Sequence, residues 1–297
     1  MQTCSLNGLI LQGIGGFYYV EAADGVYECR ARGSLRKLGV TPLAGDRVRI
    51  TVGEDGTGVL EEVLPRKNSL IRPPVANLDA LVLIISMTDP EPSLPMIDRM
   101  IAVAEHKGME PILVFNKTDL CDAAELETLY REAGFSVLSV CAMQPQTIAP
   151  LATLLRGKVC AFAGNSGAGK SSVLNVLDPS LDLEVGETSK KLGRGRHTTR
   201  SARLYPQDDG GYIADTPGFS SIDAQRLEHI DKEELASCFR EFVPFLDGCR
   251  FTSCSHTVEK GCRLREALDN GDIAPSRHES YVALYAEAKE WKAWENR

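Results

Sequence analysis

The sequence predicts a multi-domain protein with a small β-barrel over residues 1–66, a doubly wound α/β domain over residues 67–223 and a mostly helical domain over residues 224–297. Three observations predict this architecture. The first part alternates β-forming runs with glycine-rich turns, the second alternates strand and helix patterns, and the third combines helical patterns with a cysteine cluster. With 297 residues, 43% of them apolar, the chain has material for more than one core.

The bulk properties exclude some classes of protein. A net charge of −8 gives no global sign of nucleic-acid binding, although an average can hide local patches. The N-terminus lacks the features of a secretory signal, and the longest apolar run, Ala80–Ile85, is too short to span a bilayer. We therefore expect a cytoplasmic monomer with no membrane partner. In a reducing compartment, clustered cysteines among the nine indicate metal rather than disulfides.

The first part carries the pattern of a closed barrel. Five short strands within about 60 residues favour an OB-fold, which often binds oligonucleotides across one face. The cationic residues of this part are interleaved with tyrosines, which suits a surface that follows phosphates and stacks bases. The alternative is a solvated face with tyrosines in the core. The predicted strands are Gly8–Ile14, Phe17–Ala22, Val26–Ala31, Arg47–Val52 and Gly58–Leu64.

The second part follows a proline-rich stretch, Pro65–Pro74, which is typical of a linker. Beyond it, strand and helix patterns alternate, as in a parallel sheet with helices on both faces. The predicted elements are the strands Leu78–Met87, Pro111–Phe115 and Phe135–Val140, and the helices Ser93–Lys107 and Asp122–Ala133.

A phosphate-binding loop follows the apolar strand Val159–Ala163. The sequence Gly164-x-x-x-x-Gly169-Lys170-Ser171 matches the P-loop pattern in full, between a strand and a helix. Its glycines let backbone N–H groups converge on phosphate oxygens. Lys170 is expected to reach the β- and γ-phosphates and Ser171 to bind Mg²⁺. The candidate phosphate-binding residues are Gly164, Asn165, Ser166, Gly167, Ala168, Gly169, Lys170, Ser171 and Ser172.

A second motif, Asn116-Lys117-Thr118-Asp119, comes directly after a predicted strand. A carboxylate at Asp119 can accept from both N1–H and the 2-amino group of guanine, and adenine offers neither donor. Asn116 can bond the base edge, and the stem of Lys117 can cover the ring. Cys141 and Ala142, after another strand, are candidates to give a backbone N–H to guanine O6.

The third motif is Asp215-Thr-Pro-Gly218, also at a predicted strand end. Asp215 is expected to hold Mg²⁺ through water, and the Gly218 N–H to sense the γ-phosphate. Ordinary GTPases place the phosphate loop before the Asn-Lys-x-Asp motif, and this chain reverses that order. The central domain is therefore predicted to be a circularly permuted P-loop GTPase.

The segment Glu187–Arg200 is basic and contains two glycines, which predicts a mobile loop. Its cations could neutralise RNA phosphates, or be solvated without a partner. Thr198 and Thr199 are candidates for the threonine that closes on Mg²⁺ and the γ-phosphate. Phe219 stands where many GTPases have a water-orienting glutamine, so His197 is the candidate catalytic group. The alternative is a histidine facing RNA or solvent.

The third part contains Cys249, Cys254, His256 and Cys262, a Cys₃His set suited to a closed, structural zinc site. The other cysteines are interpreted as small core residues and the remaining histidines, His106, His229 and His278, as surface or interface residues. The predicted helices are Lys232–Phe239, Arg263–Asn270 and Ser276 to the end.

Together these motifs resemble the ribosome-small-subunit-dependent GTPase A family, and the match covers nearly the whole chain. The resemblance implies an OB-fold, a permuted GTPase domain and a zinc domain. It also implies late maturation of the small ribosomal subunit as the function, with that subunit and its rRNA as partners and as stimulators of GTP hydrolysis. It places the proposed catalytic histidine at His197. One departure is Cys141-Ala-Met-Gln-Pro-Gln146, where the family more often has Ser-Ala and a Thr-Gly turn.

Two other functions fit the motifs less well. One is a nucleotide-gated RNA-binding module in which hydrolysis only resets binding. The other is a zinc-dependent adaptor with a degenerate nucleotide site, against which the intact Lys170, Ser171, Asp119 and Asp215 argue.

Overall fold

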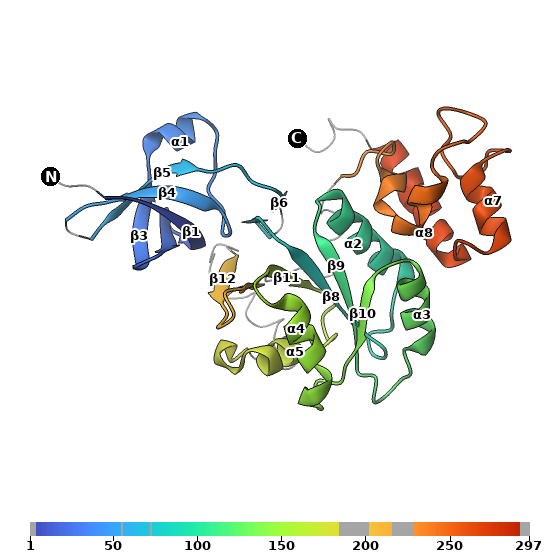
Figure 1. Ribbon diagram of the computed structural model, residues 1–297, viewed down its shortest axis with the longest axis horizontal. Helices are drawn as coiled ribbons and strands as arrows, with labels where there is room; N and C mark the ends of the chain where they lie inside the picture. The colour runs from blue at the N-terminus through green and yellow to red at the C-terminus, as the bar shows by residue number, and fades with distance from the viewer. Residues whose placement is uncertain (1–3, 55, 72, 184–201, 216–228, 292–297) are drawn as a thin grey trace.

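The three parts of the chain lie side by side, with the barrel at one end, the central sheet in the middle and the C-terminal helices at the other end (Figure 1). The structure is a computed structural model that describes residues 4–54, 56–71, 73–183, 202–215 and 229–291. Within these ranges, no helix is both long and apolar enough to cross a membrane.

The N-terminal part is a closed five-stranded barrel, as the sequence predicts. Its strands follow the order β1-β2-β3-β5-β4 and close through a β1–β4 pair, with β3 and β5 parallel. This is the connectivity of an OB-fold. A short helix, α1 (Gly33–Lys37), was not predicted. The strands are β1 (Cys4–Ile14), β2 (Phe17–Ala22), β3 (Gly25–Ala31), β4 (Arg47–Val52) and β5 (Gly58–Val63).

The barrel surface is less cationic than its composition indicates. Arg32 pairs with Glu61, and Arg49 pairs with Glu62 at 2.9 Å. Two of the three tyrosines, Tyr18 and Tyr27, pack against the barrel core. The sequence could not show this, because cross-strand pairing decides which side chains share a face.

The stretch predicted as a linker is an ordered junction. It holds a small sheet of β6 (Ser69–Leu70) and β7 (Val75–Ala76). The Arg66 guanidinium donates twice to the fully buried Asp46 carboxylate of the barrel, at 2.6 and 2.8 Å. Asn77 Nδ2 also donates to the Gly45 carbonyl at 2.8 Å. The junction therefore completes the hydrogen bonding of the barrel.

The central sheet runs in the order β10-β9-β8-β11-β13-β12, with only β12 antiparallel to its neighbour. Every residue of β8 is buried, as expected for the middle of a sheet covered on both faces. One register pair, Gln12 with Arg203, joins β1 to β12, so barrel and central strands form one continuous sheet. The strands are β8 (Ala80–Ser86), β9 (Glu110–Asn116), β10 (Ser136–Ser139), β11 (Val159–Ala163), β12 (Arg203–Pro206) and β13 (Tyr212–Asp215).

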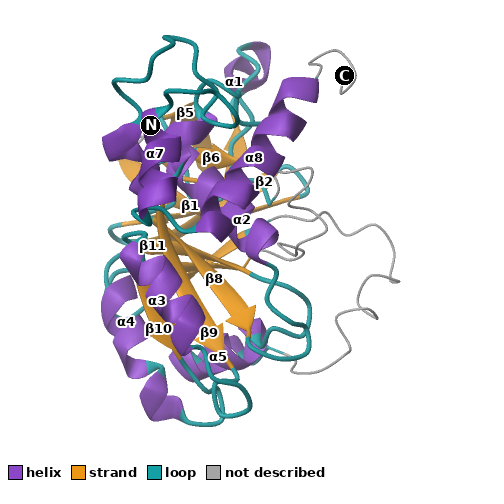
Figure 2. Cartoon of the chain, turned by 90° about the vertical axis from the view of Figure 1, so that its right-hand side faces the viewer, coloured by secondary structure: helices purple, strands orange, loops and turns teal. Residues whose placement is uncertain are grey.

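Helices cover both faces of this sheet (Figure 2). On one face lie α2 (Leu94–His106) and α3 (Ala124–Glu132), whose buried residues share a core with the C-terminal part. On the other lie α4 (Ala149–Leu155) and α5 (Lys170–Leu177), whose buried residues form a second core. Two single-turn 3₁₀ helices, η1 (Pro145–Thr147) and η2 (Pro179–Leu181), lie at the start of α4 and the end of α5.

The C-terminal part packs on α2 around a buried arginine. Arg277 bonds both Asp98 of α2 and Glu241 of η6, and its side chain is 1% exposed. The predicted helix over Lys232–Phe239 is only a 3₁₀ turn, and the last helix ends at Glu290. The elements are η5 (Leu235–Cys238), η6 (Arg240–Phe245), α7 (Arg263–Asn270) and α8 (Pro275–Glu290).

Candidate nucleotide site and metal cluster

The candidate phosphate loop connects the end of β11 to the start of α5. Gly164, Gly167 and Gly169 all have positive φ, and a Cβ on Gly164 would lie 2.2 Å from the Ile84 carbonyl oxygen. Only glycine fits so close to β8 in that conformation. The Lys170 ammonium donates to the carbonyls of Gly164 (2.6 Å) and Asn165 (3.0 Å), and burial lowers its pKa. The loop therefore curls around a partly desolvated cation beside a helix N-terminus, which is the arrangement that binds phosphates.

The Asn116 side chain joins the Asn-Lys-x-Asp motif to the phosphate loop. It is 2% exposed, and its Nδ2 donates to the Ala168 carbonyl in the phosphate loop at 3.0 Å. A Cβ on Gly169 would lie 2.2 Å from this Nδ2 atom. The Ala142 N–H donates to Asn116 Oδ1 at 3.3 Å. Residues 116, 142 and 168, far apart in the sequence, thus meet at the carboxyl edge of the sheet, where α/β folds bind ligands.

The rest of the Asn-Lys-x-Asp turn is fixed by bonds to its neighbours. Lys117 has a φ of 65°, uncommon for a residue other than glycine, and its Nζ donates to the Asp89 carbonyl at 2.5 Å. Thr118 Oγ1 donates to the Val140 carbonyl at 3.0 Å. The Asp119 carboxylate is exposed at the end of this turn, beside the Cys141 thiol. Burial, and then the adjacent carboxylate, raise the pKa of that thiol.

A cleft lies beside the phosphate loop, between β8 and the start of α2. Gly164, Asn165 and Ala168 line it, together with apolar residues of α2 such as Met96. Neither Asp119 nor Cys141 lines this cleft. A base held by Asp119 would therefore lie outside it.

Several predicted site residues fall outside the described part of the chain. These are His197, Thr198, Thr199 and Gly218, and only the backbone of Asp215 is described. Asp215 ends β13, the neighbour of β11, so the third motif begins at the same edge of the sheet as the phosphate loop.

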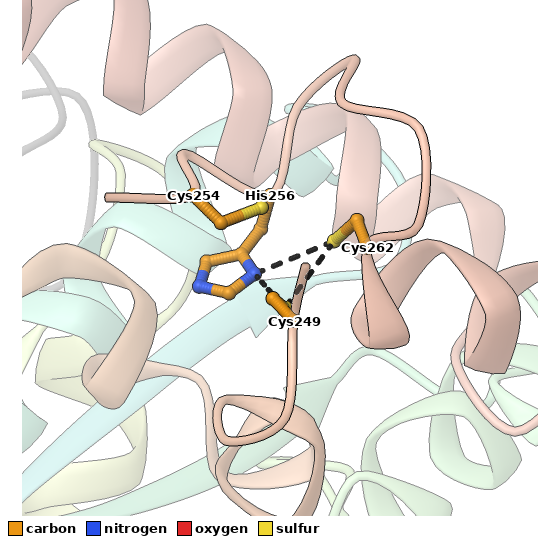
Figure 3. Close-up of side chains that lie close together, drawn as sticks. All are labelled: Cys249, Cys254, His256 and Cys262. Carbon is orange, nitrogen blue, oxygen red and sulfur yellow. Dashed lines mark hydrogen bonds between the residues drawn. The ribbon is translucent and has the colours of Figure 1, made fainter. Parts of the chain in front are cut away.

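The predicted metal ligands come together in the C-terminal part (Figure 3). The ligand atoms of Cys249, Cys254, His256 and Cys262 all lie within 4.8 Å of one another. His256 Nδ1 is 3.6 Å from Cys249 Sγ and 3.5 Å from Cys262 Sγ, and those two sulfurs are 4.0 Å apart. Tetrahedral zinc, with bonds of about 2.3 Å to sulfur and about 2.0 Å to nitrogen, requires edges of roughly 3.5–3.8 Å. The cluster therefore fits one tetrahedral cation.

Comparison with known proteins decides the family. The RsgA GTPase family profile matches residues 63–225, and the RsgA N-terminal domain profile matches residues 7–60. The chain belongs to the RsgA GTPase family. A relative from Caldanaerobacter subterraneus subsp. tengcongensis, named small ribosomal subunit biogenesis GTPase RsgA, is 43% identical over 96% of each chain. Another of that name, from Geobacillus thermodenitrificans, is 42% identical over 96% of this chain and 98% of its own.

Two solved structures share the fold of this chain. YjeQ from Thermotoga maritima superposes with a TM-score of 0.85 at 35% identity, covering 97% of this chain and all of that one. YloQ, described as a circularly permuted GTPase, superposes with a TM-score of 0.81 at 32% identity, covering 97% of this chain and 96% of that one. The permuted fold predicted from the motif order and the GTP hydrolase class predicted from the motifs are confirmed, and a guanine nucleotide is the family's ligand.

The residues that support the metal cluster in this RsgA-family GTPase were not predicted from the sequence. Glu259 accepts hydrogen bonds from the N–H groups of Ser255 (2.8 Å) and Thr257 (3.1 Å), which flank His256. From α8, His278 Nε2 lies 2.8 Å from the His256 carbonyl, and Tyr281 donates to the Ser255 carbonyl at 2.7 Å. His278 is therefore buried behind the cluster, and its interpretation as a surface or interface residue missed this contact. Only the Ser-x-x-x-Glu spacing could have suggested the Glu259 bonds.

The remaining cysteines only partly match the prediction of core residues. Cys29, Cys141, Cys160 and Cys238 are buried, and burial raises the pKa of Cys160 and Cys238 to about 12. Cys121 is exposed, contrary to the prediction. It lies just beyond the Asn-Lys-x-Asp turn, before the start of α3.

Proposed function

We propose that this GTPase assists late maturation of the small ribosomal subunit in the cytoplasm, as a monomer whose GTP hydrolysis the subunit stimulates. GTP binding is supported by the hydrogen bond from the Asn116 amide to Ala168, which connects the Asn-Lys-x-Asp turn to the phosphate loop. The ribosomal part is supported by the relatives named small ribosomal subunit biogenesis GTPase RsgA, which match 96% of this chain.

The roles of the site residues follow from their chemistry. Residues 164–172 bind the phosphates through their N–H groups, with Lys170 adding its charge. Asp119 accepts from guanine N1–H and the 2-amino group. Ser171, and Asp215 through water, would hold Mg²⁺, which neutralises phosphate charge. The Ala142 N–H, which donates to Asn116 over a long 3.3 Å, is proposed to meet guanine O6.

We propose that the Cys₃His cluster holds one structural Zn²⁺. Four protein ligands leave no position for a substrate, which favours stabilisation over catalysis. Burial lowers the pKa of His256, so its imidazole is neutral at physiological pH, as a metal ligand must be.

The hydrolysis test compares GTP turnover with and without purified small subunits. We expect subunits to raise GTP turnover and leave ATP untouched, and we expect Ser171→Ala to abolish the activity. Ser237→Ala is the matched control, because Ser237 lies in η5 of the C-terminal part, where its hydroxyl donates to the Glu234 carbonyl. Equal turnover of ATP, or no response to subunits, contradicts the proposal.

A second measurement addresses the proposed catalytic group. We propose that His197 positions or deprotonates the attacking water, and that Thr198 or Thr199 and the Gly218 N–H close on the γ-phosphate. His197→Ala should lower kcat and leave the Kd for GTP unchanged. An unchanged kcat would remove His197 from catalysis without affecting the nucleotide site.

A further inference from the structure

The loop that carries Cys141 and Ala142 is fastened by one hydroxyl. Thr147 Oγ1 accepts the Cys141 N–H at 3.0 Å, and it lies 2.8 Å from the Gln144 carbonyl oxygen and 3.2 Å from that of Cys141, within donating distance of both. Thr147 belongs to η1, and the next residue, Ile148, is 2% exposed in the core beneath α4. The hydroxyl therefore ties the loop to an anchored part of the fold.

The same loop supports Asp119 from its other side. The Ala142 N–H donates to Asn116 Oδ1 at 3.3 Å, and the Cys141 thiol lies beside the Asp119 carboxylate. Asp119 itself is exposed, and the described residues give it no cation as a partner. The Asp119 carboxylate thus lies against a side chain whose backbone Thr147 holds.

We infer that Thr147 is a positioning residue for guanine recognition. This inference rests on the proposed nucleotide site. Thr147 does not touch the base. It sets the backbone of residues 141 and 142, and through them the direction of the Asp119 carboxylate and the Asn116 amide. Its effect should fall on recognition of the base, which GTP and GDP share, and not on the chemical step.

The test is Thr147→Val, which keeps the shape and removes the hydroxyl, leaving the Cys141 N–H without its partner. We expect the Kd values for GTP and GDP to rise together by about tenfold, with kcat unchanged. Thr147→Ser should bind like the wild type. The control is Thr153→Val, which removes an exposed α4 hydroxyl that donates to the Ala149 carbonyl at 3.3 Å.

A base analogue separates positioning from general loosening. Inosine triphosphate lacks the 2-amino group, so wild-type protein should bind it more weakly than GTP through the lost bond to Asp119. If Thr147 acts through Asp119, the GTP-to-inosine triphosphate preference shrinks in Thr147→Val. Equal weakening of both nucleotides, or no change in the Kd for GTP, would overturn the inference. If the wild type itself shows no guanine preference, the proposed nucleotide site is wrong, which is a different result.

Discussion

The buried arginine of α8 offers the sharpest test of how the C-terminal part is held. The side chains of Arg277 and Asp98 are each 1% exposed, and that of Glu241 is 8% exposed. Replacing Arg277 with methionine leaves two buried carboxylates without a counter-charge. Removing one partner of a buried ion pair costs about 3–5 kcal/mol, because the desolvation penalty of the remaining charge is no longer offset.

Urea unfolding followed by circular dichroism measures this cost. We expect Arg277→Met to lose about 3–5 kcal/mol, and the Arg277→Met/Asp98→Asn double variant to lose about 1–3 kcal/mol less than the sum of the single changes. Arg49→Met is the control, because the Arg49–Glu62 pair is about half exposed on both sides and should be worth no more than about 1 kcal/mol. A loss below about 1 kcal/mol for Arg277→Met, or additive single changes, would refute the reasoning.

Three further predictions follow from contacts described above. Gly169→Ala should weaken GTP binding at least tenfold in a fluorescence titration, because the added Cβ would lie 2.2 Å from Asn116 Nδ2. The control is Gly210→Ala, which has a similar φ of 83° and no atom within 4 Å of the added Cβ, and which should leave GTP binding unchanged. Burial raises the pKa of Glu259, but its hydrogen bonds outweigh burial and lower that pKa to about 2 from 4.5. The Glu259 carboxylate therefore stabilises the folded state fully above pH 4.5, and this contribution is lost as the pH falls toward 2. Thermal melts at pH 5 and pH 3 should show a smaller loss in Glu259→Gln than in the wild type; equal losses contradict this. Chelation should release one Zn²⁺ per chain by mass spectrometry and lower the Tm, and a chain that keeps its Tm without metal would contradict a structural role.

The elements that the sequence predicted well are those set by local patterns. The barrel strands, β8, β9 and the helix α7 agree with prediction within a few residues, because alternation, apolar runs and glycine turns lie within each segment. The phosphate loop and the Cys₃His set were found for the same reason, since spacing along the chain carries both motifs. The order of the motifs predicted the permuted fold.

The features that escaped prediction depend on residues distant in sequence. The Asn116–Ala168 bond spans 52 positions and the Asp98–Arg277 pair spans 179. No local pattern marks Arg277, which in isolation resembles any helical surface arginine. Thr147 belongs to no recognisable motif, because its role depends on the hydrogen bonds that it makes where the loop after β10 folds back on itself.

The bonds between the barrel and the residues after it set the smallest fragment that can be expected to fold alone. A fragment ending at residue 66 would keep the Arg66–Asp46 pair but lose the Asn77 bond to Gly45 and the bridge of Val75 to Ala44. A fragment extended through Leu78, which is fully buried, would keep these contacts. The barrel can thus be expected to keep its fold in another protein only together with residues 67–78, which the sequence pattern places in the central domain.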